Sequence, residues 1–456
     1  MKPSISDKPA LIIIFSLILF FSSTSVCYLP PSYSQLNINS PQTLSNTPGN
    51  STDPQIALYN NNLYVVWSDD STGNGDIYFK RSVDNGTTFQ SVENLSNSPG
   101  NSTDPQIALF NNNLYVVWSD DSTGNGDIYF KRSVDNGTTF DTVNNISENN
   151  TGSSSDPQIG TNSNNVYLVW TDTSSNMSEI FYRQSIDGGV KFGGLKEISK
   201  TKSINGEFAL YPKIVTSGNK VFVAWQDKVL GGNEIFFRAS NDGGNKFTGI
   251  KNLSRNNTGD SISPVLAANA NNTFIAWSDT SPGKSEILLR SSLDNGNTFG
   301  GVKNISWNVG SSYDPQLAIS GRNLYVLWED NSQGGLTFDL IFRASSDGGR
   351  NFAEKQNIAR YLGESSDYGQ IITVGNNVFV VWSESPQFSY PPKYEIFIKT
   401  SRDNGTTFGD GVNLSNNNGS SVDPNIAISQ DKKTVFVVWS DTSNDNSEIS
   451  LVRLQI

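Results

Sequence analysis

The sequence contains a long internal repeat. The segment 44–89 reads LSNTPGNSTDPQIALYNNNLYVVWSDDSTGNGDIYFKRSVDNGTTF and recurs at 95–140 with two differences, Thr47 becoming Ser98 and Tyr59 becoming Phe110. More divergent copies follow to the end of the chain. A period of about fifty residues is typical of propeller blades, each of which needs its neighbours to bury its faces. The chain of 456 residues is therefore expected to fold as one closed body.

Each repeat contains four short strand-like segments separated by Asn, Gly, Asp and Ser turns. In the first copy they lie near 54–58, 63–67, 76–82 and 92–96. The second segment is a continuous run of β-branched and aromatic residues, which indicates a strand that is buried on both faces. Four such strands predict one small antiparallel sheet for each repeat. The second segment ends in a tryptophan in every repeat, at Trp67, Trp118, Trp170, Trp225, Trp277, Trp328, Trp382 and Trp439.

The eight tryptophans predict an all-β, eight-bladed propeller, with a seven-bladed ring as the alternative. The eighth repeat ends after three strands, at Ile456. The missing strand is expected at the other end of the chain, because residues 37–45 stand directly before a repeat, as every fourth strand does. We expect this N-terminal segment to pair with the last strand and close the ring, since closure removes exposed sheet edges.

Seven repeats carry the motif S-x-D-x-G-x-x-F after the third segment. Its Asn-Gly or Gly-Gly pair allows positive φ, its carboxylate can accept backbone N–H groups across the turn, and its Phe fills the gap between sheets. We interpret these residues as structural, together with the Arg or Lys that precedes each motif. The aspartates of the motif are Asp84, Asp135, Asp187, Asp242, Asp294, Asp347 and Asp403.

This motif is the Asp-box, or BNR repeat, and the chain from about residue 44 resembles the Asp-box propellers of the sialidase type. The resemblance implies an active face opposite the boxes, with three arginines, a Tyr-Glu nucleophile pair and an Asp acid. On the loops of that face this chain offers only Arg255 and Arg360 as arginines. The strand entrances also read Asp-Pro-Gln where the family has Arg-Ile-Pro. The resemblance therefore predicts the fold, and it leaves glycoside hydrolysis of the sialidase type as an alternative function.

The N-terminus reads as an export signal. An apolar run over 10–21 follows Lys2 and Lys8, and it is shorter than the ~20 residues of a spanning helix. We expect a signal peptide or signal anchor over 1–27, a linker over 28–35 and the propeller over 36–456. The single cysteine, Cys27, is either a lipid-attachment site or incidental. With many Asn-x-Ser/Thr acceptors, these features predict a secreted or cell-surface glycoprotein.

Composition excludes several classes of function. The chain has no histidine, which removes the commonest zinc ligand and the commonest general base. Its net charge is −12 and its basic runs are short, so nucleic acid is not an expected partner. We expect a monomer that binds a glycan or a cell-surface protein.

Acidic residues mark the face opposite the boxes. Carboxylates at the strand entrances around a central channel could hold Ca²⁺, which takes six to eight oxygen ligands, and we expect no other cofactor. The alternative is that each acid caps its own turn. Asp367 stands at such an entrance in the seventh repeat. The metal-ligand candidates are Asp53, Asp104, Asp156, Asp314 and Asp423.

Irregular aromatic and charged residues gather in the sixth and seventh repeats. Exposed aromatic side chains beside polar groups commonly build sugar and peptide sites. We therefore predict a binding or interaction module, with a glycoside hydrolase and a structural surface-matrix protein as alternatives, and an enzyme role stays open. The candidate ligand-binding residues are Trp307, Tyr313, Arg360, Tyr361, Glu364, Tyr368, Tyr390 and Tyr394.

Overall fold

The computed structural model describes residues 37–148, 151–175, 177–200, 208–229, 231–255, 258–332, 337–359, 365–385, 393–443 and 446–456. Leu36–Ile456 forms one compact unit. The leader and linker expected over 1–27 and 28–35 lie outside the described residues, as do Arg360, Tyr361, Glu364 and Tyr390. The named elements of the described ranges are all strands, and these ranges contain no helix of the length and apolarity that a membrane span requires.

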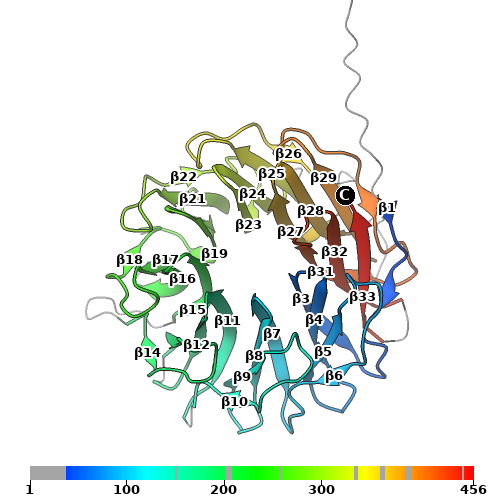
Figure 1. The fold of residues 1–456 in the computed structure, drawn as a ribbon. Helices are drawn as coiled ribbons and strands as arrows, with labels where there is room; N and C mark the ends of the chain where they lie inside the picture. Colours follow the sequence, from blue (N-terminus) through cyan, green and yellow to red (C-terminus); the bar gives the residue numbers. More distant parts are fainter. Residues whose placement is uncertain are drawn as a thin grey trace, which may run out of the picture. The chain divides into compact units, whose positions relative to one another are not determined.

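The fold is an eight-bladed β-propeller of four-stranded antiparallel sheets, and the seven-bladed alternative is wrong (Figure 1). The first strand of each blade is the innermost. It contacts the first strand of the next blade, and the series closes where β31 meets β3. These first strands are β3 (Ser51–Tyr59), β7 (Ser102–Phe110), β11 (Ser154–Asn162), β15 (Leu210–Ser217), β19 (Ser261–Asn269), β23 (Ser312–Ser320), β27 (Ser366–Val374) and β31 (Ser421–Ile428).

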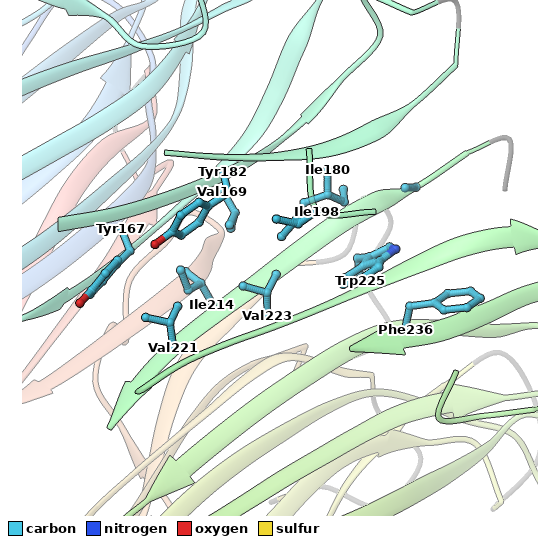
Figure 2. Close-up of a cluster of buried hydrophobic side chains, with 11 residues drawn as sticks. Tyr167, Val169, Ile180, Tyr182, Ile198, Ile214, Val221, Val223, Trp225 and Phe236 are labelled. Carbon is cyan, nitrogen blue, oxygen red and sulfur yellow. The ribbon is translucent and has the colours of Figure 1, made fainter. Parts of the chain in front are cut away.

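The second strands form the core between blades. They are β4 (Asn62–Asp69), β8 (Asn113–Asp120), β12 (Asn165–Asp172), β16 (Lys220–Val229), β20 (Asn272–Asp279), β24 (Asn323–Asp330), β28 (Asn377–Glu384) and β32 (Thr434–Asp441). Both faces of each strand are buried, because each face packs on a neighbouring blade. Between blades 3 and 4, for example, Tyr167 and Val169 of β12 join Val223 and Trp225 of β16 in one cluster (Figure 2). The apolar runs of the sequence follow from this packing.

The third strands run toward the boxes. They are β5 (Asp76–Ser82), β9 (Asp127–Ser133), β13 (Glu179–Ser185), β17 (Gly232–Ser240), β21 (Glu286–Ser292), β25 (Asp339–Ser345), β29 (Glu395–Ser401) and β33 (Glu448–Gln455). Register fixes the two ends of a blade: Asp69 pairs with both Ser51 and Asp76 at one end, and Leu63 pairs with Ser82 at the other. The box after Ser82 therefore lies at the end opposite the strand entrances.

Hydrogen bonds within the box hold its turn. The carboxylate of Asp84 accepts from Ser82 Oγ at 2.7 Å and from the Thr88 N–H at 2.8 Å. These hydrogen bonds, with the Thr88 hydroxyl first, lower the pKa of Asp84 to about 2. Gly86 has φ 73°, and a Cβ there would meet the Phe436 ring at 2.7 Å, so glycine is required. The box is thus a self-contained turn that also touches the neighbouring blade.

The fourth strands are the outermost and have two residues each. They are β6 (Glu93–Asn94), β10 (Asn144–Asn145), β14 (Lys196–Glu197), β18 (Lys251–Asn252), β22 (Lys303–Asn304), β26 (Gln356–Asn357) and β30 (Val412–Asn413). In blade 8 this place is taken by β1 (Asn37–Ile38) and β2 (Gln42–Thr43), which both pair with β33. Leu44 then donates its N–H to the Ile449 carbonyl at 2.6 Å. The expected closure of the ring by the N-terminal segment is confirmed.

Ring closure predicts the cost of truncating Leu44. Its side chain is 1% exposed and packs with Leu63, Trp67 and Phe436 across the last junction. Leu44→Ala is expected to lower the free energy of unfolding by about 2–5 kcal/mol. Leu95→Ala is the matched control, because Leu95 is equally buried and makes the equivalent bond to Ile77 inside the ring. Chemical denaturation that finds Leu44→Ala harmless and Leu95→Ala costly would contradict closure by the N-terminal strands.

Candidate functional site

A cavity of about 660 Å³ opens among the inner strands of blades 4 to 7. Its walls come from β15, β19, β23 and β27, with one side chain from β24. It lies near the strand entrances, and therefore on the face opposite the boxes. The polar and aromatic residues that line it are Tyr211, Lys213, Ser263, Asp314, Gln316, Glu329, Asp367, Tyr368 and Gln370.

Every first strand has a bulge at its entrance, and the residue there has positive φ. In β3 the register slips between Thr52 and Gln55, and Asp53 has φ 55°. The eight equivalent residues are Asp53, Asp104, Asp156, Tyr211, Ser263, Asp314, Tyr368 and Asp423. Asp tolerates this conformation because its short polar side chain can bond locally, whereas a bulky aromatic residue adopts it at a cost.

Two of the eight bulge positions carry tyrosine, and both tyrosines line the cavity. Tyr211 has φ 53° and Tyr368 has φ 58°, and about half of each side chain is exposed. Full burial of an aromatic side chain could offset the cost of positive φ. Neither Tyr211 nor Tyr368 is fully buried, so burial does not explain why tyrosine occupies these positions. Strain of this kind commonly marks a functional position.

Glu329 breaks another regular position of the repeat. The residue after the blade tryptophan is Ser or Thr in six blades, Gln226 in blade 4 and Glu329 in blade 6. Both longer side chains accept a bulge N–H from the next blade, Gln226 from Ser263 at 3.1 Å and Glu329 from Tyr368 at 3.0 Å. Burial, followed by the nearby Asp367 and Asp314 carboxyls, raises the pKa of Glu329 to about 8. Glu329 thus holds the backbone of Tyr368 and carries a proton at neutral pH.

The remaining charged groups of the cavity are also shifted by burial. Burial raises the pKa of both Asp314 and Asp367, and Asp367 is hydrogen-bonded to Tyr394. Burial and the Asp367 charge raise the pKa of Tyr394 to about 12. Burial lowers the pKa of Lys213, the cation among the lining residues. The cavity therefore offers hydroxyl groups, carboxyl groups with raised pKa values, and one amine.

The predicted ligand-binding residues that lie in the described ranges do not all line the cavity. Tyr368 lines the cavity. Tyr394 forms a hydrogen bond with Asp367, which also lines the cavity. Tyr313 instead packs edge-to-face on Phe338, with ring centroids 5.9 Å apart. Trp307 follows β22 and is 78% exposed, away from the cavity lining.

Sequence reasoning missed three lining residues. Tyr211 and Lys213 stand in a Tyr-Pro-Lys triplet where other repeats have Asp-Pro-Gln, and Glu329 stands in Trp-Glu-Asp where most have Trp-Ser-Asp. These departures from the repeat were visible signals. Asp367 lies at the entrance of β27, one residue before the bulge position, which is occupied by Tyr368.

The candidate metal ligands sit singly, one on each bulge. Burial raises the pKa of Asp104, with smaller effects from Asp156 and Asp53 on the adjacent blades. Over the described ranges, no group of three or more acidic side chains is placed to hold an ion, and the Ca²⁺ site stays a prediction. The acid after the tryptophan caps its own turn: Asp69 accepts from Ser51 Oγ at 2.7 Å and from the Ser71 N–H at 3.0 Å.

Comparison with known proteins supports the fold. No family model and no curated protein matches the chain. Among solved structures, the polysaccharide lyase Uly1 is 11% identical, with a TM-score of 0.50 and coverage of 81% of this chain and 94% of that chain. A leech intramolecular trans-sialidase is 11% identical, with a TM-score of 0.40 and coverage of 90% and 91%. An α-L-arabinanase from Penicillium chrysogenum is 14% identical, with a TM-score of 0.41 and coverage of 64% and 90%. At these identities the similarity concerns the fold.

The proton on Glu329 predicts a pH-dependent stability. Since its pKa is higher in the folded protein than the ordinary value of 4.5, the folded state binds more protons between that value and about 8. Its contribution to stability therefore falls as the pH rises through this window. Glu329→Gln, which copies Gln226, is expected to match the parent at about pH 5 and to be more stable by roughly 2 kcal/mol at about pH 9, after discounting for solvent screening.

Denaturation of both proteins across this pH range measures the difference. The control is Glu354→Gln, because Glu354 is an exposed carboxyl outside the cavity, and this variant reports the effect of removing one surface carboxylate. A Glu329→Gln difference that varies with pH no more than that of the control would contradict the elevated pKa.

Proposed function

We propose that this chain is an exported glycan-binding propeller, secreted or held at the cell surface, and that its ligand occupies the cavity of blades 4 to 7. The observation that carries the proposal is the pair Tyr211 and Tyr368, two half-exposed tyrosines on strained bulges that flank one cavity. Sugar rings present apolar faces that pack on aromatic side chains, and hydroxyl groups that bond to carboxyl and amine groups.

The other groups of the cavity suit the same ligand class. Asp314 and Asp367 can accept hydrogen bonds from sugar hydroxyls, and Lys213 can bind a carboxylate or a hydroxyl oxygen. The volume of about 660 Å³ lies within the usual range for small-ligand sites, enough for a few sugar units. The fold is compatible with such a ligand, because the polysaccharide lyase Uly1 shares it. Fold alone assigns no function, so the proposal depends on the cavity.

Glycoside hydrolysis is the second candidate function, and Glu329 favours it. A buried carboxyl group that keeps its proton at neutral pH can act as a general acid, and ionised carboxylates beside it can act as base or nucleophile. Glu329 lines one cavity with Asp314 and Asp367, so a candidate acid and two further carboxyl groups lie together. A third possibility, a structural surface-matrix protein, needs no ligand in the cavity.

Binding is tested on a glycan array, followed by calorimetry with the best ligand. Tyr368→Ser is expected to weaken binding by about tenfold or more, because a stacking aromatic contact is lost. Trp307→Ser is the matched control, since Trp307 is a more exposed aromatic residue on the loop before blade 6 and does not line the cavity. Loss of binding in the Trp307 variant with retention in the Tyr368 variant would place the ligand elsewhere. Absence of any glycan ligand would favour the matrix alternative.

Turnover separates binding from hydrolysis. A panel of fluorogenic glycosides is incubated with the parent protein and with Glu329→Gln. If the parent hydrolyses a substrate, Glu329→Gln is expected to slow hydrolysis by about 10²-fold or more while still binding the glycan, because the general acid is lost. Equal turnover by the two proteins would contradict the acid role, and a parent without turnover leaves the binding function.

A further inference from the structure

A second cavity, of about 460 Å³, lies on the outer flank where blade 4 meets blade 5. Its walls are β18 with the residues that follow it, and the side of blade 5 formed by β21 and its box. Figure 1 shows β18 and β21 toward the outer edge of the ring, on the side away from the channel. Three cationic side chains line this groove, Lys251, Arg255 and Arg290, and no carboxylate lines it.

Arg290 lacks a hydrogen bond that two of its equivalents form. At the same position before the box, Arg238 donates from Nε to the Thr248 carbonyl at 2.7 Å and Arg343 to the Ala353 carbonyl at 2.7 Å. The Nε of Arg290 is buried and has no hydrogen-bond partner, as is also true of Arg183 in blade 3. A buried donor without a partner costs free energy, so an acceptor is missing at this position.

The junction at blade 3 differs from this one in the charge of the residue beside the arginine. There the equivalent arginine, Arg183, forms an ion pair with Glu148 at 3.0 Å. Glu148 and Arg255 are the same position of the repeat, because each follows a fourth strand and donates its N–H to the strand asparagine at 2.8 Å. Where blade 3 has an opposite charge, blade 5 has a second guanidinium facing the first. Burial and the Arg255 charge both lower the pKa of Arg290.

Lys251 adds a third unpaired cation. Its equivalents Lys196 and Lys303 each donate to a carbonyl of the next box, at 3.0 Å to Gly244 and 2.8 Å to Gly349. Within the described residues, Lys251 forms no such bond. The box carboxylate of blade 5, Asp294, is occupied by Ser292 and Thr298 inside its own turn.

We propose that Lys251, Arg255 and Arg290 form a binding site for a sulfate-type oxyanion, either free or as the sulfate ester of a saccharide. A tetrahedral sulfate group, which carries two negative charges when free and one as an ester, can accept from two guanidinium forks and an ammonium at once, and it replaces the carboxylate that Glu148 supplies in blade 3. The groove is larger than one oxyanion needs, and Phe299 forms part of its wall, which leaves space for an attached sugar ring. This site is separate from the cavity of blades 4 to 7 and does not depend on the proposed function.

The site is tested by placing the charge of residue 148 at position 255, and the charge of residue 255 at position 148. Arg255→Glu recreates the pairing of Glu148 with Arg183, so it is expected to abolish sulfate binding and to raise the melting temperature in chloride. Glu148→Arg creates the two-arginine arrangement in blade 3 and is expected to add a second, weaker sulfate site. Calorimetry with sodium sulfate at millimolar concentration and constant ionic strength measures the stoichiometry, and it avoids the general stabilisation that concentrated sulfate produces.

The two sources of the anion are separated by comparing inorganic sulfate, a monosaccharide sulfate and the unsulfated monosaccharide. Binding of the sulfated sugar about tenfold tighter than sulfate assigns a saccharide ligand, and equal binding assigns the free anion. The proposal is overturned if sulfate does not bind, if Arg255→Glu binds it as well as the parent, or if the unsulfated sugar binds as tightly as its sulfated form.

Discussion

The antiparallel pairing of β33 with β1 and β2 is the interaction on which the ring depends. Seven blades are built from consecutive chain, but blade 8 takes its outer strands from the N-terminus, so both ends of the described chain meet in one sheet. The same segment places Leu44 in the cluster that joins blades 8 and 1, beside Trp67 and Val438. The N-terminal segment therefore covers the free edge of β33 and also fills the core between blades 8 and 1. Closing the ring and packing these two blades are for this reason coupled.

Within the ring, the acids that recur in the repeat accept hydrogen bonds from their own blade. Asp84 is bonded inside its box, and Asp69 inside the turn that follows its strand. Groups used in this way in every blade have few bonds left for a ligand. Function is therefore expected where the repeat is broken, and the two tyrosine bulges, Glu329 and the Arg255–Arg290 contact are such places.

The fold could be predicted from the sequence because its determinants recur at fixed spacing. The eight tryptophans, the boxes and the three-strand last repeat each point to the same ring. The site could be predicted only in part. Whether Asp367 or Tyr368 occupies the bulge depends on a one-residue register. The raised pKa of Glu329 depends first on burial and then on Asp367 and Asp314, which come from blades 7 and 6. Proximity across blades is not a local property of the sequence, although the Tyr-Pro-Lys and Trp-Glu-Asp triplets gave a usable signal.

Propeller geometry explains why one acidic chain can hold sites of opposite character. Bulge positions converge on the axis, so carboxylates that are far apart in sequence approach each other in a partly buried space. Burial first, and then the nearby carboxylates, raise the pKa of Asp104 and of Glu329. Residues on the outer flank contact the next blade alone, so a single substitution there changes the charge of the junction. Glu148 beside Arg183 gives an ion pair, whereas Arg255 beside Arg290 gives two cations that form no ion pair with any acid in the described part of the chain. Inner sites therefore arise from several blades acting together, and outer sites arise one junction at a time.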